Sequence, residues 1–126
     1  MARVEDYRDL KVYRAAFALQ QRVFEASRSF PNEERFSLTD QVRRSSRSVG
    51  ANVAEAWKKR RYRAHSVSKL TDADAEAAET RHWIATASAC GYLGDDARAD
   101  LEGRTREVGR MLGAMIRDAD RWCTTH

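Results

Sequence analysis

Positively charged side chains are concentrated in one stretch of the chain, residues 43–63. This stretch contains eight arginines and lysines and a single acid, Glu55. The eight cations are Arg43, Arg44, Arg47, Lys58, Lys59, Arg60, Arg61 and Arg63. Cations gathered on a helix neutralise phosphates and release the counterions of a polyanion. The chemistry that this stretch indicates is therefore binding of RNA or DNA.

Two aromatic residues, Trp57 and Tyr62, lie in the same stretch and are candidates for stacking on bases. Two other interpretations of the cations stay open. They can form a solvated surface that keeps the protein in solution, or they can bind an acidic protein. Because like charges on one helix repel each other, a purely solvated surface accounts for the pattern less well.

A cluster of carboxylates follows the basic stretch directly: Asp72, Asp74, Glu76 and Glu79. Asp72 and Glu76 have the i, i+4 spacing of paired ligands on a helix, and Glu79 with His82 forms one ExxH motif. Helical bundles that bind two metal ions need two such motifs, so we expect no metal site. Ion pairs with a neighbouring helix or subunit are the favoured role of these acids.

Four polar residues accompany the apolar stripe of the second expected helix: Gln41, Ser48, Asn52 and Glu55. They form either a catalytic or ligand-binding cluster or, as we favour, a hydrogen-bond network that fixes helix pairing. No arrangement of nucleophile and base stands out in the sequence, and no glycine-rich phosphate loop is present. We therefore expect no catalytic residues and no cofactor.

The composition favours a few long helices, because six glycines and one proline in 126 residues provide few turn signals. Apolar residues recur at helical period in four segments, residues 10–30, 36–62, 65–93 and 95–122. In the second segment Val49, Val53 and Trp57 should dock the helix in the core. We predict an all-α fold, an antiparallel up-down-up-down four-helix bundle with long helices. Residues 1–126 should form one domain.

Local signals set the expected ends and faces of these helices. We expect the N-caps to be Asp9, Ser66 or Ser68, and Asp95 or Asp96. The first helix carries two neighbouring apolar stripes, one of them through Tyr13, Phe17 and Phe24, which together predict one wide buried face. Gly50, inside the second helix, is expected to allow close packing at a cost of up to about 1 kcal/mol.

The sequence also bears on where the protein resides. The amino terminus, MARVEDYRDL, lacks the apolar core of a signal peptide. No apolar run approaches the roughly 20 residues of a membrane span. The two cysteines, Cys90 and Cys123, are far apart and give no disulfide framework. We expect a cytoplasmic protein with no membrane contact.

The segment DLKVYRAAFALQQRVFEASRSFPNEERFSLTDQVRRSSRSVGANVAEAW resembles the four-helix-bundle family encoded by intervening sequences in bacterial 23S ribosomal RNA genes. The matching positions are Asp9, Leu10, Val12, Tyr13, Phe30, Pro31, Glu34, Leu38, Gln41, Arg43, Arg44, Ser48, Val49, Asn52, Val53, Ala54 and Glu55. The sequence departs from the family pattern at Ala56, where glycine is usual. This change is expected to let the helix run straighter into the basic stretch.

Two segments of the second half, SKLTDADAEAAETRHW and EVGRMLGAMI, are similar to the accessory variability protein of diversity-generating retroelements. The resemblance implies a homopentameric ring with a basic surface that binds nucleic acid and a reverse transcriptase. We therefore expect a non-enzymatic, ring-like oligomer that binds RNA or DNA largely without sequence specificity. The alternative is an interaction scaffold for an acidic or reverse-transcriptase-like protein.

Overall fold

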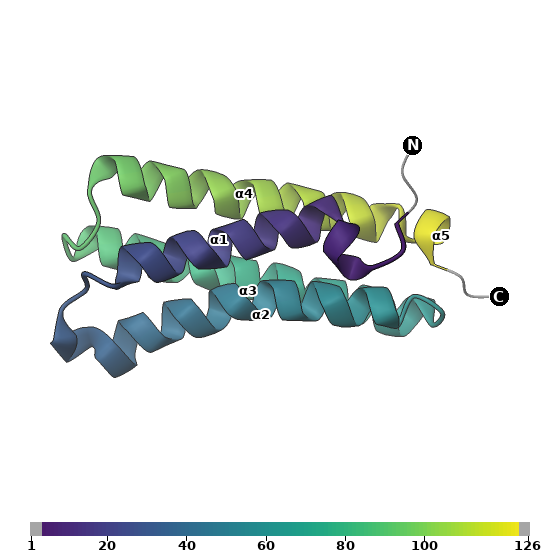
Figure 1. Ribbon diagram of the computed structural model, residues 1–126, viewed down its shortest axis with the longest axis horizontal. Coiled ribbons are helices and arrows are strands. Elements are labelled where there is room, and N and C mark those ends of the chain that lie inside the picture. The colour runs from purple at the N-terminus through teal and green to yellow at the C-terminus, as the bar shows by residue number, and fades with distance from the viewer. Residues whose placement is uncertain (1–3, 124–126) are drawn as a thin grey trace.

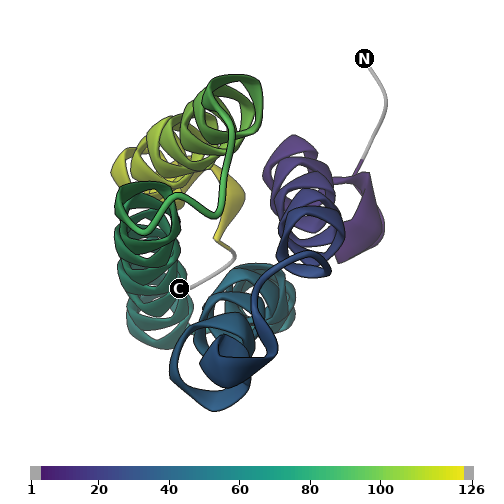
Figure 2. The same ribbon diagram turned by 90° about the vertical axis from the view of Figure 1, so that its left-hand side faces the viewer.

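The computed structural model describes residues 4–123, most of which are helical, with no strand among them. Four long helices make up the fold: α1 (Lys11–Ser27), α2 (Asp40–Lys58), α3 (Arg63–Ala89) and α4 (Asp95–Arg117). Successive helices run in opposite directions along the long axis (Figure 1). The end view in Figure 2 shows them arranged around a common centre. The predicted all-α, up-down-up-down bundle is confirmed.

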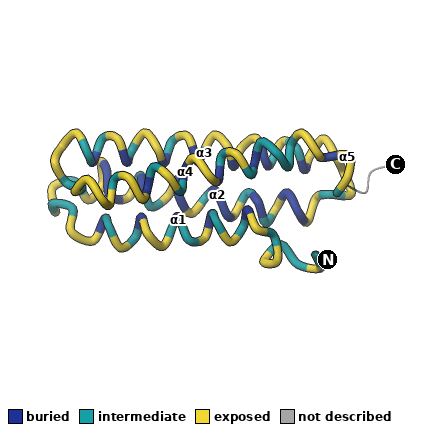
Figure 3. The backbone as a smooth tube through the Cα atoms, turned by 90° about the horizontal axis from the view of Figure 1, so that it is seen from above, coloured by how far each residue is buried: buried dark blue, intermediate teal, exposed yellow. Residues whose placement is uncertain are grey.

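Each helix packs on two neighbours, because α1 contacts α2 and α4, and α3 contacts the same two helices. The buried core residues are Val12, Ala16, Leu19 and Val23 of α1, Val42, Val49, Val53 and Ala56 of α2, Leu70, Ala73, Ala77 and Ile84 of α3, and Leu101, Val108 and Leu112 of α4. They follow the inner sides of the helices (Figure 3). Full burial of one such valine or leucine stabilises the fold by about 1.5–3 kcal/mol.

The helix ends differ from the expected ones. Asp9 is not the N-cap of α1. It ends a short 3₁₀ turn (Tyr7–Asp9), and its carboxylate accepts the backbone N–H of Asp6 at 3.2 Å. Ser66 does not cap α3 but is buried, and its hydroxyl donates to the Ala56 carbonyl at 2.7 Å. Gly94, whose backbone is extended, is the N-cap of α4, so Asp95 and Asp96 lie in the first turn of that helix.

The chain also bends where continuous helices were expected. A short 3₁₀ turn (Asn32–Glu34) and a wider π turn (Arg35–Thr39) lead into α2. The last expected helix divides at Asp118 into α4 and the short α5 (Ala119–Trp122). The Trp122 indole donates to the Met115 carbonyl at 2.9 Å, which folds α5 back on the end of α4.

A polar cluster joins α2 to α3. Arg44 donates to Glu76 at 3.0 Å and also to Glu79, and the Trp83 indole donates to Glu79 at 3.0 Å. Deeper in the interface the Thr80 hydroxyl donates to the Ser45 hydroxyl at 2.9 Å. The expectation that the acidic cluster pairs with a neighbouring helix is confirmed for Glu76 and Glu79.

The Glu79 carboxylate predicts acid sensitivity of the bundle. The Trp83 indole and the Arg44 guanidinium hold the pKa of Glu79 below its ordinary value of 4.5, against an opposing effect of burial. A lowered folded-state pKa stabilises the fold above about pH 4.5, and this contribution is lost as the pH falls through the folded-state pKa. In urea unfolding between pH 7 and 3, Glu79→Gln should therefore flatten the acid-side fall in the free energy of unfolding. Glu107→Gln, which changes an exposed carboxylate on α4, should leave the fall as steep as in the parent protein.

Gly50 generates a second prediction, because a Cβ at this position would lie 3.5 Å from Cε1 of Tyr13 and 3.9 Å from Cβ of Ala16. These are ordinary contact distances, so Gly50→Ala should raise the free energy of unfolding by up to about 1 kcal/mol through helix propensity. Gly50→Leu should lower it by about 1–3 kcal/mol, because the longer side chain meets α1. Urea denaturation measures both, and a destabilised alanine variant would contradict the packing described.

Candidate nucleic-acid interface

The rotation of α2 decides where its cations point. Val49 and Val53 are fully buried, so residues on the opposite side of the helix face outward. Arg43, Arg47 and Lys58 lie four and eleven positions apart, which are about one and three helical turns. They consequently share one side of α2, and we call these three residues the cationic line.

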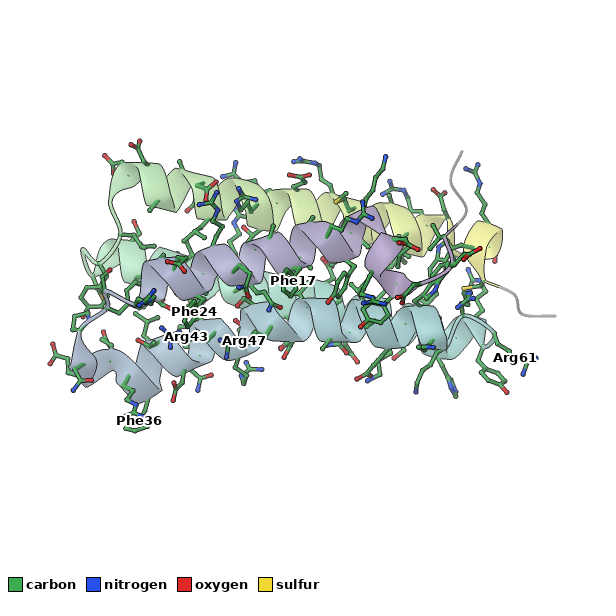
Figure 4. The ribbon with its side chains drawn as sticks, viewed as in Figure 1. Phe17, Phe24, Phe36, Arg43, Arg47 and Arg61 are labelled. Atoms are coloured by element: carbon green, nitrogen blue, oxygen red, sulfur yellow. The ribbon has the colours of Figure 1, made fainter. Side chains whose placement is uncertain are left out.

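At one end of the cationic line the arginines surround a phenylalanine ring of α1. The Phe24 centroid lies 4.8 Å from Cζ of Arg43, 5.9 Å from that of Arg47 and 5.8 Å from that of Arg28. The Arg43 Nε also donates to the Ser27 hydroxyl at 2.8 Å. Figure 4 shows Phe24, Arg43 and Arg47 together between α1 and α2. These contacts restrain the guanidinium groups without neutralising them.

Three other cations of the basic stretch have internal roles. Arg44 pairs with the acids of α3 described above, and Arg63 pairs with Asp120 at 2.6 Å. Arg60 lies over the Trp57 ring at 4.1 Å and donates to the Trp57 carbonyl at 2.9 Å. No sequence pattern indicates this division, because each partner is distant in the sequence or depends on the local bend.

The remaining cations of the stretch, Lys58, Lys59 and Arg61, are exposed at the carboxyl end of α2. Neither lysine forms an ion pair within residues 4–123. Figure 4 shows Arg61 at the opposite end of the bundle from Arg43 and Arg47. The eight predicted cations therefore form two groups, one in the amino-terminal half of α2 and one at and beyond its carboxyl end. The cationic line includes Arg43 and Arg47 from the first group and Lys58 from the second.

The two aromatic residues within the basic stretch have different environments. Trp57 is 8% exposed, with its ring between Arg60 and the stacked Trp122 ring, whose centroid is 6.1 Å away. The suggestion that Trp57 stacks on bases is therefore wrong, and its other expected role in docking α2 is confirmed. Tyr62 is exposed, beside His65.

An exposed aromatic ring that the sequence pattern assigned to the core lies beside the cationic line. Phe17 of α1 is 45% exposed, because α1 buries the stripe through Val12 and Ala16. The neighbouring stripe, which contains Phe17, lies at the edge of this buried face. A hollow of about 250 Å³ opens beside it between α1 and α2. We call this hollow the α1/α2 groove, and it is lined by Tyr7, Tyr13, Phe17, Gln20, Arg47, Gly50, Ala51 and Ala54.

The α1/α2 groove continues toward the amino end of α2. A second hollow of about 490 Å³ shares Arg47 and Ala51 with it and is also lined by Asp40, Arg43, Arg44 and Ser48. Small residues form the α2 side between the cations of the line, where Ala51 and Ala54 lie between Arg47 and Lys58. In the α1/α2 groove Arg47 faces the rings of Tyr7, Tyr13 and Phe17, whereas the second hollow is lined by α2 residues alone.

The four polar residues of the proposed network are only partly linked. Asn52 donates to the Ser48 carbonyl of its own helix at 2.9 Å, and Glu55 pairs with Lys69 of α3 at 2.8 Å. Within residues 4–123, Gln41 makes no side-chain hydrogen bond to them. Ser45–Thr80 and Ser66–Ala56 are buried hydrogen bonds that do cross from α2 to α3. A role in fixing helix pairing stays a prediction for these four residues.

Two other features are absent from the part of the chain that the structure describes. Residues 4–123 contain no group of three or more His, Cys, Asp or Glu side chains placed to hold a metal ion. None of the helices in this range is long and apolar enough to cross a membrane.

Comparison with known proteins gives a consistent result. Residues 8–114 match the family model described as 23S rRNA-intervening sequence protein. A crystal structure of a protein of unknown function from the S23 ribosomal protein family of Bacteroides thetaiotaomicron superposes with a TM-score of 0.76 at 26% sequence identity. The superposition covers 84% of this chain and 95% of that one. No functionally curated protein matches the chain. Because the family match spans most of the sequence, the chain belongs to the 23S rRNA-intervening sequence protein family.

Proposed function

We propose that this protein binds nucleic acid, without catalysis and largely without sequence specificity, through the cationic line of α2. One observation carries the proposal. Arg43, Arg47 and Lys58 share one side of a helix and form no ion pair with an acid within residues 4–123. Arg44, one position from Arg43, is paired twice. Cations that remain unpaired in a row are suited to a phosphate backbone.

The proposed contact positions a backbone and does not read bases by hydrogen bonding. Arginine and lysine contacts to phosphate oxygens give affinity and orientation and carry no direct sequence information. Three acids of the α2/α3 side are engaged, since Glu76 and Glu79 bind Arg44 and Glu55 binds Lys69. One acid, Asp40, lines the same hollow as Arg43 and Arg47. Arg43 and Arg47 outnumber this single carboxylate, so the amino end of the line keeps a net positive charge. Such a charge also speeds association with a polyanion.

We further propose that the protein assembles as a homopentameric ring, as the family resemblance implies. The outer side of α3 supports this proposal, because its exposed alanines, Ala75, Ala78 and Ala85, permit close approach of a second subunit. Contact through α3 leaves the cationic line of α2 accessible. A ring would bring several such lines together and strengthen the field that a nucleic acid experiences.

A second candidate function is an interaction scaffold for a reverse-transcriptase-like protein. One observation favours it, a hollow of about 770 Å³ between α1 and α4 with an apolar lining. Trp57, Trp122, Met111 and Met115 line its interior, and Lys11 lies among its lining residues. Aromatic and methionine side chains are enriched in protein interfaces. An apolar segment of a protein partner would fit this surface.

Charge reversal tests the nucleic-acid proposal. Arg47→Glu with Lys58→Glu should weaken binding of labelled RNA and DNA about tenfold or more. The slope of log K against log salt should fall by about 0.7 to 0.9 for each phosphate that the variant no longer neutralises. The matched control is Lys11→Glu with Arg22→Glu, the same change in charge at the same eleven-residue spacing on exposed positions of α1. If both pairs weaken binding equally, net charge and not the cationic line governs it.

Mass measurement tests the ring separately from nucleic acid. Light scattering on the purified protein should give about five times the 14.4 kDa of the chain. Ala78→Arg, which places a long charged side chain on the outer side of α3, should reduce that mass because it obstructs close approach. A 14.4 kDa species for the parent protein would contradict the assembly and leave the binding proposal standing.

A further inference from the structure

We propose that the α1/α2 groove binds single-stranded nucleic acid, with a base stacked on Phe17 and the adjacent phosphates held by Arg47 and Arg43. This inference rests on the proposed function and specifies its substrate class and contact mode. It derives from three features of the groove: one open aromatic face, cations restrained beside it, and small residues between the two.

The open aromatic face is that of Phe17. Its side chain is 45% exposed, and its neighbour Tyr13 lies 6.2 Å away at an interplanar angle of 32°. Tyr13 is in turn held edge-on by Tyr7, with ring centroids 4.9 Å apart. The three rings therefore support one another along the wall of the groove and leave Phe17 outermost. Aromatic rings presented in this way bind bases of any sequence, since every base has a flat π face.

The two phenylalanines of this wall have different roles. Phe24 is surrounded by the guanidinium groups of Arg28, Arg43 and Arg47, at 4.8 to 5.9 Å from its centroid. Its ring is therefore engaged in holding the arginines. Phe17 has no such cation over it within residues 4–123, so its face remains available to a ligand.

The cations lie where the backbone of a stacked strand would run. Arg47 lines the same hollow as Phe17, and Arg43 lines the adjoining one. The other α2 residues of the hollow are Gly50, Ala51 and Ala54, so Arg47 is the one long side chain on the α2 wall of the hollow, and Gln20 of α1 lines it as well. Charge complementarity with phosphate distinguishes this surface from an apolar docking site, and the exposed ring distinguishes it from a simple basic patch.

The exposed ring favours a single strand over a duplex. Bases in a duplex are stacked on one another and do not offer their faces, whereas unpaired bases can be splayed out and stacked on aromatic side chains. A duplex could still contact the cationic line through its phosphates. Removal of Phe17 should thus affect the two forms differently.

The experiment compares Phe17→Ala with Phe36→Ala on the full-length protein. Phe36 is the matched control because it is 72% exposed but lies away from the groove (Figure 4). The probes are labelled single-stranded oligo(dT), oligo(U) and a duplex DNA of equal length. Phe17→Ala should weaken single-strand binding about tenfold, since stacking on an aromatic ring is of this size. Its salt slope and its duplex affinity should not change, and Phe36→Ala should bind like the parent protein.

The variant Phe17→Trp retains an aromatic side chain at this position. It therefore tests the inference even if Phe17→Ala fails to fold. It should keep single-strand affinity, and binding should quench the fluorescence of the new indole. Equal losses for the single strand and the duplex, equal effects of Phe17→Ala and Phe36→Ala, or no quenching would overturn the inference. A reduced oligomeric mass for Phe17→Ala would also overturn it, because Phe17 would then be a subunit contact.

The outcomes separate this inference from the function on which it rests. If the parent protein binds no nucleic acid at low salt, the proposed function fails and the inference fails with it. If the parent protein binds, with the salt dependence of phosphate contacts, and Phe17→Ala leaves single-strand affinity unchanged, only the inference fails.

Discussion

Burial of one apolar stripe of α2 is the constraint on which the rest of the molecule depends. Val42, Val49 and Val53 are almost completely removed from solvent, and such a stripe permits only one rotation of the helix. That rotation turns Gly50 toward α1 and Ser45 toward Thr80 of α3. The helical repeat then fixes the side of α2 on which each of its polar residues lies. The surface charge of this face thus follows from the packing of the core.

The same rotation sorts the arginines of α2 into two kinds. Arg44 is turned toward α3, where Glu76 and Glu79 accept its hydrogen bonds, and it becomes part of the helix interface. Arg47 is turned away from α3 toward α1, whose nearby side chains are aromatic. An arginine over an aromatic ring keeps its full charge, whereas an arginine between two carboxylates is neutralised. A three-residue shift along the helix therefore separates a cation neutralised within the helix interface from one that pairs with no carboxylate in residues 4–123.

The sequence predicts the elements of this fold better than it predicts the site. Four helices and the buried stripe of α2 follow from a local period of apolar residues, which survives in any tertiary context. The N-caps do not follow from this local period. Ser66, an expected N-cap, instead donates its hydroxyl hydrogen bond to the buried Ala56 carbonyl, ten residues away. The exposure of Phe17 was not predictable either, since α1 has two apolar stripes and only the packing of its neighbours decides which one is covered. The pairing of Arg44 depends on acids more than thirty residues away, so no local pattern reveals it.

Ala56 shows how one residue connects the fold to the cationic line. The family pattern usually has glycine at this position, and glycine in a helix costs about 1 kcal/mol relative to alanine. Here Ala56 is fully buried, its carbonyl accepts the Ser66 hydroxyl, and α2 continues without interruption to Lys58. Because the helix does not end earlier, Lys58 stays in register with Arg47, three turns before it. The expectation that alanine at this position lets the helix run straighter stays a prediction. Lys58 belongs to the row of surface cations because α2 extends two residues beyond the buried Ala56, so the end of the helix sets the length of the row.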